Sequence, residues 1–190
     1  CSNSSSYYFA GESNSNPCSS IRDLVNYVNE NYPDHHDSTC GLHLHISFKS
    51  PVYYAVLVSE KFYDNLMTFY RSWLYKNKIN SDSRAYKRLA GNRYCENKFD
   101  LDEINQQIEC NHKSDYRYRV LNYCWNLHGT LELRFLNIFD QQELTNKCIK
   151  DLVKWIDDYC DLEYKRLKNL DFEIIAEKPT IKETIEKEII

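Results

Sequence analysis

Two short segments of the chain alternate strictly between apolar and polar residues, and this alternation constrains the fold more than any other feature. The segments are residues 41–48 (GLHLHISF) and residues 130–136 (TLELRFL). Successive side chains of a β-strand point to opposite faces, so each segment predicts a strand whose apolar face packs on a core. In the first segment His43 and His45 share the polar face.

The second segment carries two charges where an ordinary strand would not. Leu131, Leu133 and Phe135 are expected on its apolar face, and the opposite face is expected to hold Thr130, Glu132, Arg134 and Leu136. Glutamate is disfavoured in strands, and an unpaired charge is costly to bury. The two strands together therefore predict one composite polar surface formed by His43, His45, Glu132 and Arg134.

The remainder of the sequence indicates mostly helices, which gives an α+β fold class. Helical spacing of apolar residues predicts helices at 20–31, 51–76, 100–109 and 141–170. Ser19 or Ser20 is the expected N-cap of the first of these helices, and Asp100 that of the third. A further strand is expected at residues 116–123, a turn at 125–129, and an irregular basic loop with at most short helical pieces at 77–97. We expect one domain over residues 1–170 and a separate C-terminal tail at 171–190.

Composition excludes several classes of protein. The chain has 190 residues and a net charge of −4, so broad nucleic-acid binding, which normally needs a basic face, is not expected. No apolar stretch approaches the ~20 residues of a membrane span. The eight cysteines form no C-x-x-C pair, which favours reduced thiols and a cytoplasmic protein. The oligomeric state is left open, with a homo-oligomer among the alternatives.

The residue types on the composite surface point to metal or phosphate chemistry. Neutral imidazoles ligate divalent metals, a carboxylate suits Mg²⁺ or Mn²⁺, and a guanidinium can hold a phosphate with two hydrogen bonds. The plainer interpretations are two surface histidines and a weak cross-strand ion pair. A basic run either neutralises a polyphosphate or forms a solvated loop; it comprises Arg84, Lys87, Arg88 and Arg93, with Arg117 and Arg119 further on.

The order and wording of these motifs resemble a known family. CGLHLHIS at 40–47, RYRVLN at 117–122 and GTLELRF at 129–135, followed by a long helix, are similar to the amidoligases. These are carboxylate–amine ligases related to glutamine synthetase and glutamate–cysteine ligase. The similarity runs from about residue 12 to 159. Residues 12–17 (ESNSNP) match the family's E-x-x-S-x-P segment and make Glu12 a candidate metal ligand.

The resemblance implies a fold, a reaction and a set of site residues. The fold would be a curved antiparallel sheet of the glutamine synthetase type, with helices packed on one face. The reaction would use ATP and Mg²⁺ or Mn²⁺ to join a carboxylate-bearing small molecule or peptide to an amine through an acyl phosphate. The implied metal ligands are Glu12, His43 and Glu132; the implied catalytic residues are His45, Arg134 and Arg117; the implied cofactor-binding residues are Arg93, Arg117 and Arg134.

The chain departs from the family at one point, and two other functions stay open. The family normally begins with a strand bearing E-x-E, and nothing before Glu12 matches it. One alternative is therefore a non-catalytic protein of this fold that binds a nucleotide or peptide, or serves in assembly. The other is a metal-free 2H phosphodiesterase, because residues 45–48 and 128–131 both match H-x-[ST]-apolar, which would make His45 and His128 catalytic.

Overall fold

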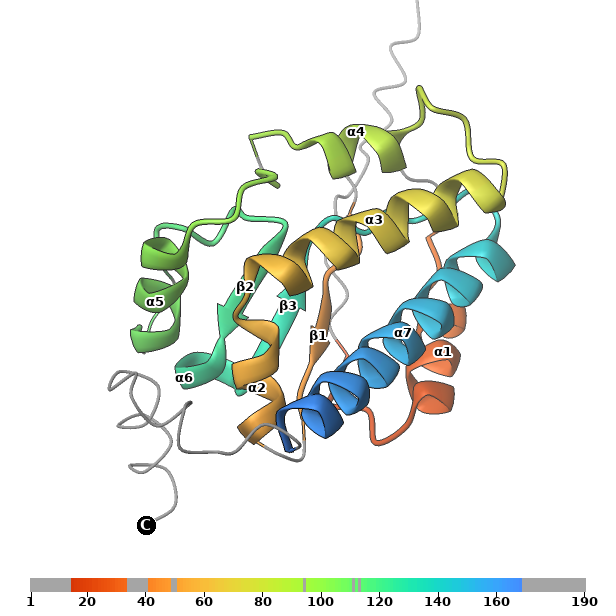
Figure 1. Ribbon diagram of the computed structural model, residues 1–190. Helices are drawn as coiled ribbons and strands as arrows, with labels where there is room; N and C mark the ends of the chain where they lie inside the picture. The colour runs from red at the N-terminus through yellow and green to blue at the C-terminus, as the bar shows by residue number, and fades with distance from the viewer. Residues whose placement is uncertain are drawn as a thin grey trace, which may run out of the picture.

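The computed structural model describes residues 15–33, 41–48, 51–93, 95–110, 112 and 114–168. It is an α+β protein, mostly helical, with a small antiparallel sheet (Figure 1). In chain order the elements are α1 (Ile21–Glu30), β1 (Leu44–Ile46), α2 (Pro51–Leu57), α3 (Glu60–Lys76), α4 (Arg84–Ala90), α5 (Leu101–Glu109), β2 (Leu121–Cys124), α6 (Trp125–His128), β3 (Thr130–Leu133) and α7 (Gln142–Lys168).

The sheet places the two predicted strands side by side. Its order is β1-β3-β2, and both pairs of neighbours are antiparallel. His45 lies opposite Glu132, and Glu132 lies opposite Asn122 on its other side. Directly paired residues share a face of the sheet, so these three form a polar row across all three strands. The adjacent row, Leu44, Leu133 and Leu121, belongs to the other face.

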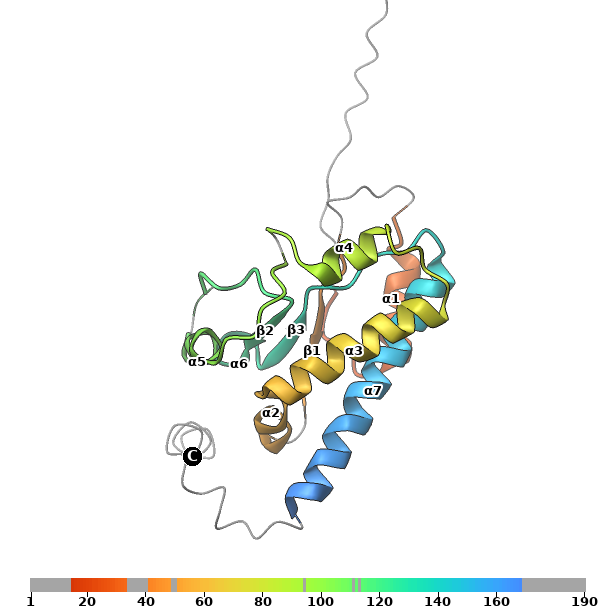
Figure 2. The same ribbon diagram turned by 45° about the horizontal axis from the view of Figure 1, so that its top comes forward.

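Helices cover that apolar face. In Figures 1 and 2, α2, α3 and α7 lie on one side of the strands. Contacts tie them to the sheet: the Tyr123 hydroxyl donates to the Leu57 carbonyl at 2.9 Å, and the rings of Tyr70 and Phe135 lie 4.8 Å apart. The fully buried core includes Leu57, Phe62, Leu66, Tyr70, Leu131, Leu133, Phe135 and Ile149. The predicted division into an apolar and a polar face is confirmed.

The long helix predicted at 51–76 is wrong in one respect, because it is two helices. The backbone is extended at Ser59 (φ −152°, ψ 145°), and its hydroxyl accepts a hydrogen bond from the Phe62 N–H at 3.1 Å. This is a helix N-cap, which satisfies a backbone donor that a helix start leaves free. The apolar spacing continues through the break, so the pattern of the sequence does not reveal it.

Other boundaries also differ from the prediction. Residues 115–118 form turns, and β2 begins only at Leu121. The carbonyls of Tyr116 and Arg117 accept hydrogen bonds from side-chain amides in place of a neighbouring strand. The turn expected at 125–129 is a one-turn helix that ends at Gly129, whose φ of 63° favours glycine.

The second key strand is also shorter than expected. β3 ends at Leu133, and Leu136, expected on the polar face, is fully buried because the chain leaves the strand pleat before reaching it. The sheet is neither closed nor strongly curled. The fold therefore supports the α+β class but gives no support to the curved sheet of the glutamine synthetase type.

Several predictions at the helix ends are confirmed. Ser20 caps α1 and Asp100 caps α5 through their side-chain oxygens.

The six cysteines in the described ranges are free thiols. None of the helices in the described part of the chain is long and apolar enough to span a membrane. Glu12 and residues 171–190 lie outside the described residues.

The cap at Ser59 gives a first prediction. Ser59→Ala removes the acceptor for the Phe62 N–H and should lower the free energy of unfolding by about 1 kcal/mol. Ser72→Ala is the control, because Ser72 is exposed within the same helix and alanine there raises helix propensity. Urea denaturation measures both variants. Equal effects of the same sign would contradict the cap.

Candidate functional site

The side chain of Glu132 lies at the centre of the polar row. It is buried, with 5% of its surface exposed. One carboxylate oxygen, Oε1, accepts a hydrogen bond from Arg134 Nη1 at 2.9 Å, and the other, Oε2, accepts one from Asn122 Nδ2 at 2.7 Å. A buried carboxylate is tolerated only with such partners. The charge on the strand that the sequence left unexplained is thus paired inside the protein.

Both histidines of the H-x-H motif face the same carboxylate. His43 Nδ1 lies 3.2 Å from Glu132 Oε1, and His45 Nε2 lies 3.9 Å from the same atom. The other ring nitrogen of His45 is 3.0 Å from the Thr130 hydroxyl, which fixes the plane of that ring. The convergence of His43, His45, Glu132 and Arg134 predicted from the sequence is therefore present. We call this group the Glu132 cluster.

The environment keeps both imidazoles neutral near pH 7. Burial, assisted by the positive charges of Arg134 and Arg88, lowers the pKa of His43 to about 3. Burial also lowers the pKa of His45, although the Glu132 carboxylate acts in the opposite direction. Neutral imidazole is the form that ligates metals and accepts protons. The cluster thus offers two neutral nitrogen bases beside one carboxylate.

The other two arginines of the predicted site lie farther out. Arg117 is exposed and lies over the Tyr118 ring, with 4.8 Å from its Cζ atom to the ring centroid. Arg134 lies over the same ring at 5.5 Å, so Tyr118 joins Arg117 to the edge of the Glu132 cluster. Arg93 lies in the exposed turn between Asn92 and Cys95, after α4.

Sequence reasoning missed a buried arginine behind the cluster. Arg88, interpreted as part of a basic loop, is only 7% exposed, and its Nη2 donates to the Arg134 carbonyl at 2.7 Å. A Cβ at Gly41 would lie 2.7 Å from the Arg88 Cζ, far inside van der Waals contact. The glycine that opens the GLHLHISF motif therefore makes room for this guanidinium. In the sequence, the one sign of this close approach was a glycine directly before an alternating strand.

Two buried amides were also missed. Asn122 is 2% exposed and Gln107, on α5, is 5% exposed. Asn122 could have been found, because an asparagine between Leu121 and Tyr123 is a polar interruption of an apolar strand. Gln107 carries no comparable signal, since a glutamine is ordinary on a helix.

Glu132 and His43 are of the donor types that a divalent ion accepts. Mg²⁺ is commonly held by one or two carboxylates together with phosphate oxygens and water. Glu132 and His43 are the two expected ligands within the described residues, and Glu12 lies outside them. In those same ranges, no group of three or more histidine, cysteine, aspartate or glutamate side chains is arranged to hold a metal ion.

Comparison of the chain with protein-family models, with curated proteins and with solved structures finds no match.

The lowered pKa of His43 predicts acid sensitivity. Its pKa is 6.5 in the unfolded chain and about 3 in the fold, so between these values the unfolded chain binds more protons. The free energy of unfolding must then fall as the pH drops from 7 toward 4. Because the His43 side chain is 37% exposed, we expect a loss below about 1 kcal/mol per pH unit.

Urea denaturation at pH 7 and pH 5 tests this expectation. His43→Asn should lose less stability between the two pH values than the wild-type protein does. His112→Asn, at an exposed position outside the cluster, serves as the control and should follow the wild type. An unchanged pH dependence in His43→Asn would rule out the effect.

Proposed function

We propose that the protein is an ATP-dependent carboxylate–amine ligase whose active site is the Glu132 cluster. The observation that supports this proposal is the convergence of His43, His45 and Arg134 on the buried Glu132 carboxylate. Two motifs separated by more than 80 residues of sequence meet there. Their wording resembles the amidoligases, and their side chains are of the types that ATP-dependent ligation needs.

The roles of the residues follow from their chemistry. Within the described residues, the Nε of Arg134 is buried without a hydrogen-bond partner. The guanidinium also carries a permanent positive charge and further N–H donors, which suit a phosphate oxygen. Arg134 would therefore contact the phosphoryl group that is transferred. Glu132 and His43 would hold the divalent ion that accompanies ATP, and Arg117 and Arg93 would contact phosphates or substrate farther out.

The reaction has two steps that this arrangement can assist. A substrate carboxylate oxygen attacks the γ-phosphorus of ATP, so that an acyl phosphate forms and ADP leaves. The amine nitrogen then attacks the acyl carbon, phosphate leaves, and the nitrogen loses a proton. Fixed positive groups stabilise the phosphoryl charge in the first step. Neutral His45 can accept the proton in the second.

Binding of Mg-ATP is the direct test. At a ligand concentration of 100 times Kd, the wild-type protein should gain about 2.7 kcal/mol, seen as a rise of several degrees in Tm. Glu132→Gln keeps the shape of the side chain but removes its charge, and it should abolish most of that rise. Glu143→Gln, on the exposed first turn of α7, should leave the rise unchanged.

Two outcomes would redirect this proposal. Absence of a shift in the wild-type protein with either Mg²⁺ or Mn²⁺ excludes the ligase. Binding without ADP release in the presence of mixed carboxylates and amines favours a nucleotide-binding protein of the same fold.

A metal-free phosphodiesterase is the second candidate, and one observation favours it. The rings of His45 and His128 lie 6.0 Å apart in an edge-to-face arrangement, and His45 contacts Thr130 of the second H-x-[ST] motif. Two adjacent imidazoles can act as base and acid on a cyclic phosphate. Against this reading, His128 lies on the one-turn helix α6 rather than on a strand.

Hydrolysis of a cyclic phosphate in EDTA separates the two candidates. The phosphodiesterase predicts activity without metal and a loss of at least ~100-fold in His128→Ala, the usual contribution of a general acid or base. His112→Ala provides the matched control on an exposed histidine. Absence of hydrolysis by the wild-type protein would eliminate this candidate.

A further inference from the structure

A glutamine occupies a buried position on α5, where an apolar residue would be expected. Gln107 lies one turn after the buried Ile104 and is itself 5% exposed. Its amide is fully used. Oε1 accepts the Tyr123 N–H at 2.9 Å, while Nε2 donates to the Tyr116 carbonyl at 2.9 Å and to Asn122 Oδ1 at 3.2 Å. A buried amide with every group paired fixes its neighbours in one arrangement.

The amide of Asn122 continues the chain to the carboxylate. Its Oδ1 accepts from Gln107, so its Nδ2 faces the other way. That nitrogen donates to the Arg117 carbonyl at 2.8 Å and to Glu132 Oε2 at 2.7 Å. A longer contact of 3.5 Å joins Nδ2 to the Arg119 carbonyl. The two short hydrogen bonds thus go to one backbone acceptor and one acceptor of the candidate site.

The backbone dictates the direction of this chain. The Tyr123 N–H can only donate and the Tyr116 carbonyl can only accept, so Gln107 cannot be flipped. The Arg117 carbonyl fixes Asn122 in the same way. The hydrogen bonds that link these side chains therefore run from Tyr123 through Gln107 and Asn122 to Glu132. The last link offers a donor, and Oε2 of Glu132 accepts it at 2.7 Å.

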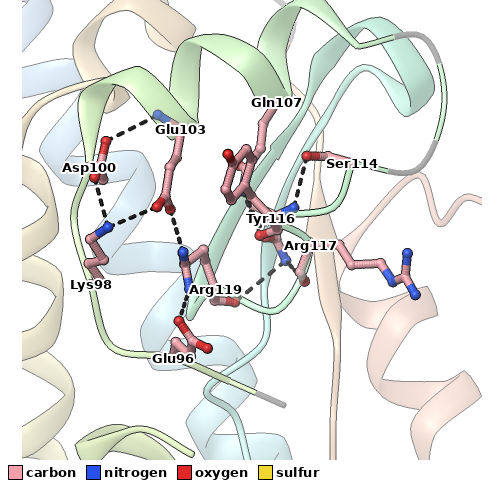
Figure 3. A network of polar contacts seen from close by, with 10 residues as sticks. Glu96, Lys98, Asp100, Glu103, Gln107, Ser114, Tyr116, Arg117 and Arg119 are labelled. Carbon is pink, nitrogen blue, oxygen red and sulfur yellow. Dashed lines mark hydrogen bonds and ion pairs between the residues drawn. The ribbon is translucent and has the colours of Figure 1, made fainter. Parts of the chain in front are cut away.

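The helix that carries Gln107 is itself anchored by charges. The Glu103 carboxylate pairs with Arg119 at 2.6 Å and with Lys98 at 2.8 Å, and Arg119 also pairs with Glu96 (Figure 3). Lys98 further contacts Asp100, the residue that caps α5. Figure 3 shows Gln107 on the same helix as Glu103, next to Tyr116. Gln107 therefore stands on a helix that is fixed at its first turn.

We infer that Gln107 is a positioning residue for the candidate site: acting through Asn122, it holds the Glu132 carboxylate in the orientation that faces His43, His45 and Arg134. Asn122 restrains one oxygen of the carboxylate, and the other is thereby presented to the cluster. Outer-shell partners of this kind are a general requirement for orienting a ligand side chain. The importance of that orientation for Mg-ATP rests on the proposed function; the orientation itself does not.

The competing explanation is that Gln107 only attaches α5 to the edge of the sheet. The two explanations predict different effects on residues far from Gln107. Attachment alone affects α5 and β2, whereas positioning reaches His43 before β1, two strands away from β2. A readout on the His43 ring therefore separates them, and it requires no ligand.

The experiment compares Gln107→Met with Gln106→Met. Methionine preserves the approximate volume without the amide, and Gln106 is the exposed neighbour on the same helix. In ¹⁵N-labelled protein, the side-chain resonances of His43 and Arg134 should shift by more than their linewidth in Gln107→Met and stay in place in Gln106→Met. The Kd for Mg-ATP should rise about 10-fold or more in Gln107→Met only.

Each result has a defined meaning. Resonances of His43 and Arg134 that stay in place in folded Gln107→Met overturn the inference. Shifted resonances in a protein whose wild type binds no Mg-ATP uphold the positioning and overturn the proposed function. If Gln107→Met does not fold, Gln107→Ala, which leaves space for water at the orphaned backbone groups, provides the same comparison.

Discussion

The burial of one carboxylate organises this protein. Glu132 lies on the central strand of the sheet with 5% of its surface exposed, and a charge in such a place must be surrounded by donors. Asn122 donates from one neighbouring strand, and Arg134 donates from the position directly after the central strand. His45, on the other neighbouring strand, lies 3.9 Å away from the carboxylate. Loss of a single partner from such a group typically costs about 3–5 kcal/mol. The three strands are thus joined by polar contacts on one face and by apolar packing on the other.

Local patterns predicted much of this fold. The alternation in β1 and β3 assigns the correct face to His43, His45 and Glu132, and the caps at Ser20 and Asp100 locate two helix starts. Strand boundaries that depend on hydrogen-bond partners distant in the sequence could not be predicted. β2 begins late because amides of Gln107 and Asn122 occupy the carbonyls before it. Only the fold brings Gln107 near those carbonyls.

The candidate site divides in the same way. The residues that meet at Glu132 were predictable because strand periodicity aligns them, whereas the register that puts Asn122 opposite Glu132 depends on how β2 pairs. The exposure of Arg88 was misjudged because a charged side chain is usually expected to face solvent. On α4 it turns inward, and its guanidinium meets a main-chain carbonyl behind the cluster. A positive charge at that place also helps to keep His43 neutral.

The close approach of Gly41 and Arg88 has an evolutionary consequence. The guanidinium fills the volume that any side chain at position 41 would need, so the two positions compete for one space. Alanine or a larger residue at position 41 would displace the Arg88 guanidinium, which is the end of a flexible side chain, and with it the contact to the backbone at residue 134. Among descendants of this sequence, glycine at position 41 should therefore be kept wherever the arginine at position 88 keeps that contact.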